Sequence, residues 1–244
     1  MLLNCDLGES FGVWSMGQDT DIMPWLDQAN IACGFHASDP ETMVRTVHLA
    51  VAAGVTLGAH PAYPDLVGFG RRSMALSSAA VTSLIWYQAG ALDGIAQTFG
   101  AQLQYIKPHG ALNNDMMRDP ALLTTVMQAV VRYRSDVALM LPVTLAWPEH
   151  QAQAQALGLK LIFEAYADRA YDANGQLRAR SYPDSVHHDQ DVMVQQALSF
   201  AHKGGVYSVT GSWLDLPAQT LCVHGDTPTA LAAVKAIRQA LTTN

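Results

Sequence analysis

Short apolar segments alternate with amphipathic segments along the chain, and this alternation limits the folds that the sequence can adopt. The apolar segments are strand-like and lie at residues 2–7, 29–35, 56–60, 104–109, 137–143, 161–167 and 220–225. The segments with helical spacing lie between them or after the last one, at residues 41–53, 78–99, 121–133, 149–157, 190–201 and 229–241. Strands that are apolar on both faces are typical of a parallel sheet covered by helices.

Capping residues mark the ends of several expected helices. Asp39, Asp119 and Thr227 each precede a proline, so a capping side chain stands directly before a proline at the first helical position. Seven strand-helix units in 244 residues predict an α/β fold, a (β/α) barrel forming one domain over residues 1–244. An open, doubly wound sheet is the alternative. Residues 204–217 break the alternation, and we expect an added hairpin or loop there.

Composition limits the partners and the location of the protein. The formal net charge of −7 opposes nucleic acid as a partner, because phosphate binding needs a basic stripe that the sequence lacks. Cys5, Cys33 and Cys222 lie in apolar segments without metal-binding spacing, which indicates reduced, buried thiols. The start of the chain has no basic signal-peptide region, and no apolar run approaches about 20 residues. We therefore expect a soluble, cytoplasmic protein without membrane contact.

Polar residues gather where the apolar segments end. A parallel barrel brings the C-terminal ends of its strands to one face, so these residues predict a single site built from many strand ends. The expected members are Asp6, Glu9, His36, His60, Lys107, His109, Glu164, Asp168, Arg169, His224 and Asp226.

Lys107 and His109 stand two residues apart, so an extended chain would point both side chains to the same face. An ammonium and an imidazole at one place suit an oxyanion or a phosphoryl group. The alternative is a surface lysine beside a histidine that binds only backbone. His224 and Asp226 have the same spacing, although Asp226 could instead cap the last helix.

Asp6 and Glu9 follow the first apolar segment, and paired carboxylates can divide acid and base roles. Glu9 could instead begin a short helix. Together, Asp6, His36 and His60 are similar to a divalent-metal triad. The sequence has no tight ligand spacing such as H-E-x-x-H, and Lys107 would bring positive charge to the same place. We therefore predict a site without metal; if a metal is present, its ligands are expected to be Asp6, His36 and His60.

Two loops offer cations. Glu164, Asp168 and Arg169 follow the sixth apolar segment, and Arg169 suits a carboxylate or phosphate of the substrate unless it pairs with Asp168. Residues 63–72 are rich in glycine and aromatic residues and end at Arg72, which is typical of a lid, an anion-binding loop or a plain surface loop. No nucleotide-binding glycine motif and no G-x-S-x-G motif are present.

Six segments in order resemble the LamB/YcsF family from about Leu3 to the last helix: LNCDLGESFG, NIACGFHASDP, GAHPAYPDLVGFGRR, IKPHGALNN, EAYADRAY and CVHGD. The resemblance implies a seven-stranded, TIM-like (β/α) barrel related to the polysaccharide deacetylase fold. Bacterial members of the family act as the A subunit of an ATP-dependent 5-oxoprolinase. The resemblance therefore implies opening of 5-oxoproline (pyroglutamate) to L-glutamate with ATP as co-substrate, together with the B and C subunits of 5-oxoprolinase. One departure is Asn113, where the family usually has tyrosine, so a ring contact there is in doubt.

Opening a five-membered lactam with ATP would begin with phosphorylation of the amide oxygen, which calls for cations and a proton shuttle. We assign catalytic roles to Asp6, Glu9, Lys107, His109 and Glu164. We assign substrate binding to His36, His60, Arg72, Asp168, Arg169, His224 and Asp226. Two alternatives are a metal-dependent amide hydrolase or deacetylase that needs no ATP, and a non-catalytic protein that binds a lactam.

Overall fold

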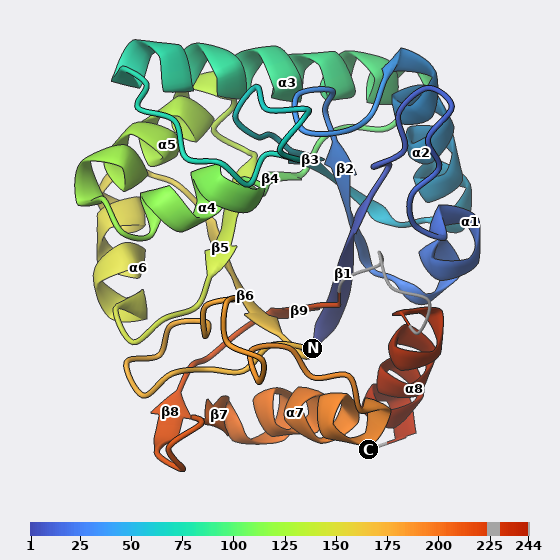
Figure 1. Ribbon diagram of the computed structural model, residues 1–244. Helices are drawn as coiled ribbons and strands as arrows, with labels where there is room; N and C mark the ends of the chain where they lie inside the picture. Colours follow the sequence, from blue (N-terminus) through green and yellow to red (C-terminus); the bar gives the residue numbers. More distant parts are fainter. Residues whose placement is uncertain (224–229, 244) are drawn as a thin grey trace.

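Seven parallel strands form a closed barrel at the centre of the molecule (Figure 1). The computed structural model describes residues 1–223 and 230–243. The strands are β1 (Leu2–Leu7), β2 (Gln28–Ala32), β3 (Thr56–His60), β4 (Tyr105–Ile106), β5 (Ala138–Pro142), β6 (Leu161–Tyr166) and β9 (Thr220–Cys222). They pair in this order, and β9 closes the barrel by pairing with both β6 and β1. The predicted seven-stranded (β/α) barrel is confirmed.

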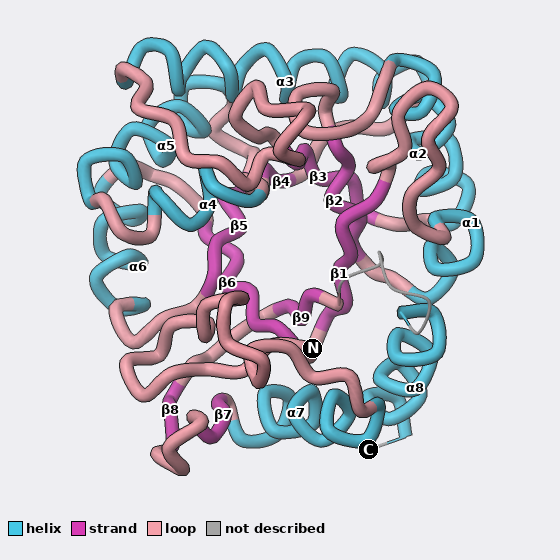
Figure 2. Tube along the Cα trace, in the orientation of Figure 1, coloured by secondary structure: helices cyan, strands magenta, loops and turns pink. Residues whose placement is uncertain are grey.

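Helices surround the barrel (Figure 2). They are α1 (Asp19–Ile22), η1 (Met23–Trp25), α2 (Pro40–Ala53), α3 (Ser78–Thr98), α4 (Gly110–Met116), α5 (Pro120–Tyr133), α6 (Trp147–Ala156), α7 (Gln190–Lys203) and α8 (Ala230–Thr243). Two of the three expected caps form, because the Asp39 side chain accepts from Thr42 N at 3.0 Å and the Asp119 side chain accepts from Ala121 N at 2.9 Å. The third, Thr227, lies outside the described residues. The break in the alternation is an antiparallel hairpin of β7 (Gly205–Tyr207) and β8 (Trp213–Asp215).

Several strands are shorter than their apolar segments. The segment predicted over residues 29–35 ends as a strand at Ala32, because Gly34 and Ser38 turn the chain with φ values of 89° and 76°. The segment predicted over 104–109 forms only two residues of β4. The backbone nevertheless continues beside β3, since Lys107 N donates to Ala59 O and His109 N donates to Pro61 O, both at 2.8 Å.

The two faces of each strand have different roles, as β1 illustrates. Leu3, Cys5 and Leu7 belong to the main hydrophobic core. Asn4 and Asp6 alternate with them and join polar contacts to other strands of the barrel. Because side chains alternate across a strand, one short sequence supplies both core and site.

Two further expectations concern the thiols and membrane contact. Cys5, Cys33 and Cys222 are free and buried, as predicted. Within the described residues, no helix combines the length and the apolar character that crossing a membrane requires.

Candidate active site

A hydrogen-bonded network inside the barrel fixes the position of Asp6. Asn30 Nδ2 donates to Asp6 Oδ1 at 2.8 Å and to Asn4 Oδ1 at 2.7 Å. The Tyr105 hydroxyl donates to Asn30 Oδ1 at 2.7 Å, and Asn4 Nδ2 donates to Thr220 Oγ1 at 2.9 Å. Buried polar groups that are satisfied in this way hold a single geometry. The carboxylate of Asp6 is therefore oriented before any ligand binds.

Lys107 is a buried cation shared by two carboxylates from different strands. Its Nζ donates to Asp6 Oδ1 at 2.9 Å and forms an ion pair with Glu164 Oε1 at 2.7 Å. The Cys222 Sγ atom lies 3.3 Å from the same nitrogen. Burial alone would lower the pKa of Lys107, but the carboxylates of Asp6 and Glu164 raise it well above its ordinary value. Lys107 thus remains charged near neutral pH.

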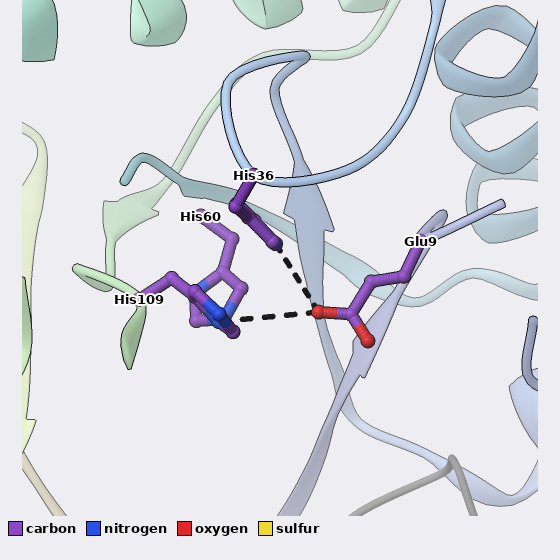
Figure 3. Close-up of side chains that lie close together, drawn as sticks. All are labelled: Glu9, His36, His60 and His109. Carbon is purple, nitrogen blue, oxygen red and sulfur yellow. Dashed lines mark hydrogen bonds and ion pairs between the residues drawn. The ribbon is translucent and has the colours of Figure 1, made fainter. Parts of the chain in front are cut away.

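Three histidines and Glu9 converge at the C-terminal ends of the first four strands (Figure 3). His36 Nε2 lies 3.2 Å from Glu9 Oε1, and His109 Nδ1 lies 3.9 Å from the same oxygen. His109 Nδ1 is also 2.9 Å from His60 Nε2. The rings of His36 and His109 stack, with centroids 3.8 Å apart and planes 7° apart.

Burial determines the charge of two of these rings. It lowers the pKa of His36 well below its ordinary value, and the neighbouring His60 lowers it further. It lowers the pKa of His109 in the same way, with His36 and His60 adding to the effect. His36 and His109 are therefore neutral near pH 7 and can act as hydrogen-bond acceptors or as ligands.

The two clusters meet in a cavity of about 310 Å³. Asp6, Glu9, His60, Lys107 and His109 form one part of its wall. Five arginines from the surrounding loops and helix ends form another part: Arg71, Arg118, Arg169, Arg178 and Arg180. Among the described residues, the lining thus holds six cationic side chains and two carboxylates. Although the whole chain is acidic, this cavity is suited to an anionic ligand.

The structure brings together seven of the predicted site residues. Asp6, Lys107 and Glu164 form one group around the lysine ammonium, and Glu9, His36, His60 and His109 form the adjoining group. Asp6 joins the two groups, since its Oδ2 lies 3.2 Å from His60 Nε2. The catalytic and binding roles of these residues remain predictions.

The other predicted residues lie differently. Arg169 lines the cavity, but its guanidinium donates to the backbone carbonyls of Ser185 and Arg178 at 3.1 and 2.7 Å. Asp168 is buried in the same loop, outside the cavity wall. Arg72 pairs with Asp65, and its side chain is 64% exposed. The neighbouring Arg71, and not Arg72, lines the cavity. His224 and Asp226 lie outside the described residues.

Some residues of the site are not among those that the sequence predicted. Asn4 and Asn30 are polar residues inside apolar strands, and Asn4 stands two residues before Asp6, so this spacing is a signal that could have identified a shared inward face. Arg118, Arg178 and Arg180 carry no comparable signal, because only the folded chain brings them to the cavity. Asn113, at the position of departure from the family, is buried and also lines the cavity.

Among the described residues, the group placed to hold a metal consists of Glu9, His36, His60 and His109, which offer one ligand atom each within 4.8 Å of one another. This group differs from the predicted set of Asp6, His36 and His60. The Oδ1 atom of Asp6 is instead bound to Lys107 and Asn30.

Known proteins resemble the chain along almost its full length. The 5-oxoprolinase A subunit 2 of Pseudomonas putida is 56% identical over 241 residues, which cover 99% of this chain and 93% of that protein. The 5-oxoprolinase A subunit of Chromohalobacter salexigens is 54% identical, with 98% and 96% covered. The crystal structure of a lactam utilization protein from Thermus thermophilus has a TM-score of 0.92 at 39% identity, covering 100% of this chain and 96% of that one. The sequence model of the LamB/YcsF family matches residues 1–244, and the chain belongs to this family, as its six motifs predicted.

Proposed function

We propose that this chain is the A subunit of an ATP-dependent 5-oxoprolinase, which opens 5-oxoproline to L-glutamate together with B and C subunits. Relatives that carry the name of this subunit are 48–56% identical to the chain over nearly its whole length. Their designation as one subunit of an enzyme supports a complex with at least one further chain. ATP as co-substrate is part of the same proposal.

The observation that carries the proposal is the composition of the cavity lining, which combines carboxylates and histidines with five arginines. The substrate bears a carboxylate, and an ATP-dependent route adds a phosphoryl group to it. Guanidinium groups bind both kinds of anion through paired hydrogen bonds. A cavity near 310 Å³ is also at the lower end of the size range of small-molecule sites, about 300–1,000 Å³.

The chemistry assigns a task to each cluster. A lactam is a poor electrophile, so transfer of a phosphoryl group to its oxygen makes the ring carbon open to attack by water. Asp6, held by Lys107 and Asn30, is placed to accept a proton from that water. The ring nitrogen needs a proton as it leaves, and Asp6 can return the proton that it took from the water. Ring opening leaves an acyl phosphate, which a second water hydrolyses to glutamate and phosphate. The arginines would hold the phosphoryl group during the attack.

Reconstitution tests the proposal. The chain is mixed with candidate B and C subunits, 5-oxoproline and ATP, and both glutamate and phosphate are followed. We expect glutamate to form only in the complete mixture and phosphate to be released with it. Glutamate formation that is unchanged when this chain is omitted would contradict the proposal.

A second candidate is a metal-dependent amide hydrolase that needs no ATP, and the cluster of Glu9 with three histidines supports it. The same assay separates the two functions. Amide hydrolysis by this chain alone, with a divalent metal and without ATP, would favour the hydrolase. Tight binding of 5-oxoproline that never leads to turnover in any mixture would favour a non-catalytic binding protein.

A further inference from the structure

Two buried imidazole rings, of His60 and His109, bring one nitrogen of each close together. His60 Nδ1 lies 2.7 Å from the Lys107 carbonyl oxygen, and His109 Nε2 lies 3.0 Å from the Phe69 carbonyl oxygen. A carbonyl oxygen can only accept, so both of these nitrogens carry the ring hydrogen. In neutral rings the remaining nitrogens, His60 Nε2 and His109 Nδ1, therefore carry lone pairs, and they are 2.9 Å apart.

Two more possible metal-ligand atoms, Glu9 Oε1 and His36 Nε2, lie close to these nitrogens. Glu9 Oε1 lies 3.9 Å from His109 Nδ1 and 3.2 Å from His36 Nε2. A proton on His60 Nε2 bridges only one pair of atoms, whereas a cation among the four side chains contacts all of them. Ligands bound to one tetrahedral Zn²⁺ at about 2.0–2.1 Å lie roughly 3.3 Å apart. The separations of 2.9, 3.2 and 3.9 Å bracket that value.

We propose that Glu9, His36, His60 and His109 form a binding site for one divalent first-row transition metal ion such as Zn²⁺. Three imidazoles and one carboxylate suit such an ion, whereas Mg²⁺ and Ca²⁺ prefer oxygen ligands. Glu9, His60 and His109 line the cavity, so the ion would face a bound substrate as a Lewis acid.

The surroundings of the rings fit this role. Ligating histidines usually donate their second ring N–H to a carbonyl or carboxylate, as His60 and His109 do here. Phe69, whose carbonyl orients His109, has a φ of 54°, an uncommon value for a residue other than glycine. The Phe69 ring also meets the edges of His36 and His109, at 5.4 and 5.3 Å between centroids.

Metal binding to the purified full chain tests the site directly. After removal of bound metal with a chelator, Zn²⁺ is titrated by calorimetry, and Co²⁺ binding is followed by its visible absorption. We expect one ion of either metal per chain, and no comparable binding of Mg²⁺. His109→Ala and Glu9→Gln should each weaken Zn²⁺ binding at least 100-fold. His202→Ala, which removes an exposed histidine at the end of α7, should leave it unchanged.

Asp6→Asn separates this ligand set from one that contains Asp6. Because Asp6 Oδ1 is bound to Lys107 and Asn30, we expect the variant to lose less than 10-fold in Zn²⁺ affinity. Circular dichroism identifies any variant that has failed to fold, and the spectrum of wild-type protein with Co²⁺ does not depend on the variants. The site is disproved if the folded wild-type chain binds neither ion, or if His109→Ala and Glu9→Gln bind as tightly as wild type. Neither result bears on ATP-dependent glutamate release, which the reconstitution measures separately.

Discussion

At the scale of single residues, Lys107 connects strands that lie on different sides of the barrel. Its ammonium group, on the segment after β4, is bound to Asp6 of β1 and Glu164 of β6. All three charges are largely removed from water, with side-chain exposures of 4%, 13% and 0%. Removing one member of such a group leaves buried charge uncompensated, and this costs more than the intact group contributes.

Lys107→Met retains the length of the side chain and removes its charge. We expect a loss of about 3–5 kcal/mol in the free energy of unfolding, because Asp6 and Glu164 would remain buried without their cation. Urea denaturation measures this value. Lys203→Met, at an exposed position on α7, is the matched control and should stay within about 0.5 kcal/mol of wild type. Equal stabilities of the two variants would contradict the expected coupling.

The three thiols should be unreactive in the folded protein. Burial raises the pKa of Cys33 to about 12, and it raises the pKa values of Cys5 and Cys222 well above their ordinary value. At pH 8 a thiol with a pKa near 12 is ionised in roughly one molecule in 10,000. A colorimetric thiol reagent should therefore detect three cysteines in denaturant and almost none in the native protein. Rapid reaction of a native thiol would show that one of them is accessible.

At the scale of elements, the loop between β3 and α3 forms a packed wall of the site. The buried Asp65 carboxylate accepts from Gly68 N at 2.9 Å and from Arg72 N at 3.3 Å, and it also binds the Arg72 side chain. This arrangement brings the Phe69 carbonyl to His109. The sequence predicted that Arg72 binds substrate, but in the structure this residue holds the loop together.

Gly70 is the point at which this loop packs directly against two of the histidines. With a φ of +64°, it leaves no room for a side chain, since an added Cβ would lie 2.8 Å from His36 Cβ and 2.9 Å from His109 Cδ2. Gly54 is a matched control, because it has a φ of +69° with nothing within 4 Å.

Gly70→Ala and Gly54→Ala should each cost about 1–2 kcal/mol of stability through the positive φ. Only Gly70→Ala should also displace the two histidines, and we expect it alone to lower glutamate release in the reconstituted complex at least tenfold. Thermal denaturation and the activity assay measure the two effects. Equal activity of the two variants would show that contact with the histidines is not needed.

The alternation of apolar and amphipathic segments predicted the strands and six of the helices, because each repeats a pattern that local residues encode. It missed the short helices α1 and η1. It also missed α4, whose residues 110–116 directly follow the Lys107–His109 pair, where the glycine indicated only a tight exit from the strand. It also placed the end of β4 too late. Backbone hydrogen bonds to β3 keep this segment extended as far as His109, so both side chains reach the site as predicted, although the strand itself ends at Ile106.

At the scale of the whole molecule, charge is distributed unevenly. The chain carries a formal net charge of −7, yet the part of its cavity lining that the structure describes holds six cationic side chains and two carboxylates. Arg71, Arg118 and Arg180 come from separate parts of the sequence, so no local pattern could predict their convergence. The strand-end residues were predictable for the opposite reason, since a parallel barrel fixes where strand ends meet.

Arg118→Ala tests whether this distribution serves substrate binding. We expect the KM for the anionic substrates to rise about tenfold, equivalent to about 1.4 kcal/mol, because one of the cavity cations is lost. Arg132→Ala is the control, since Arg132 lies over the Trp86 ring and does not line the cavity. Steady-state kinetics of the reconstituted complex give both values. An equal KM for the two variants would indicate that the cavity charge does not bind substrate.

The most direct measurement is glutamate release by a reconstituted complex that contains Asp6→Asn in place of the wild-type chain. Asparagine preserves the shape of Asp6 and removes the carboxylate that is held by Lys107 and Asn30. If lactam opening takes place in the cavity of this barrel, the folded and fully assembled variant should release glutamate at less than about 1% of the wild-type rate, the loss typical of a general base. Glutamate release at the wild-type rate would contradict the placement of the reaction in this cavity.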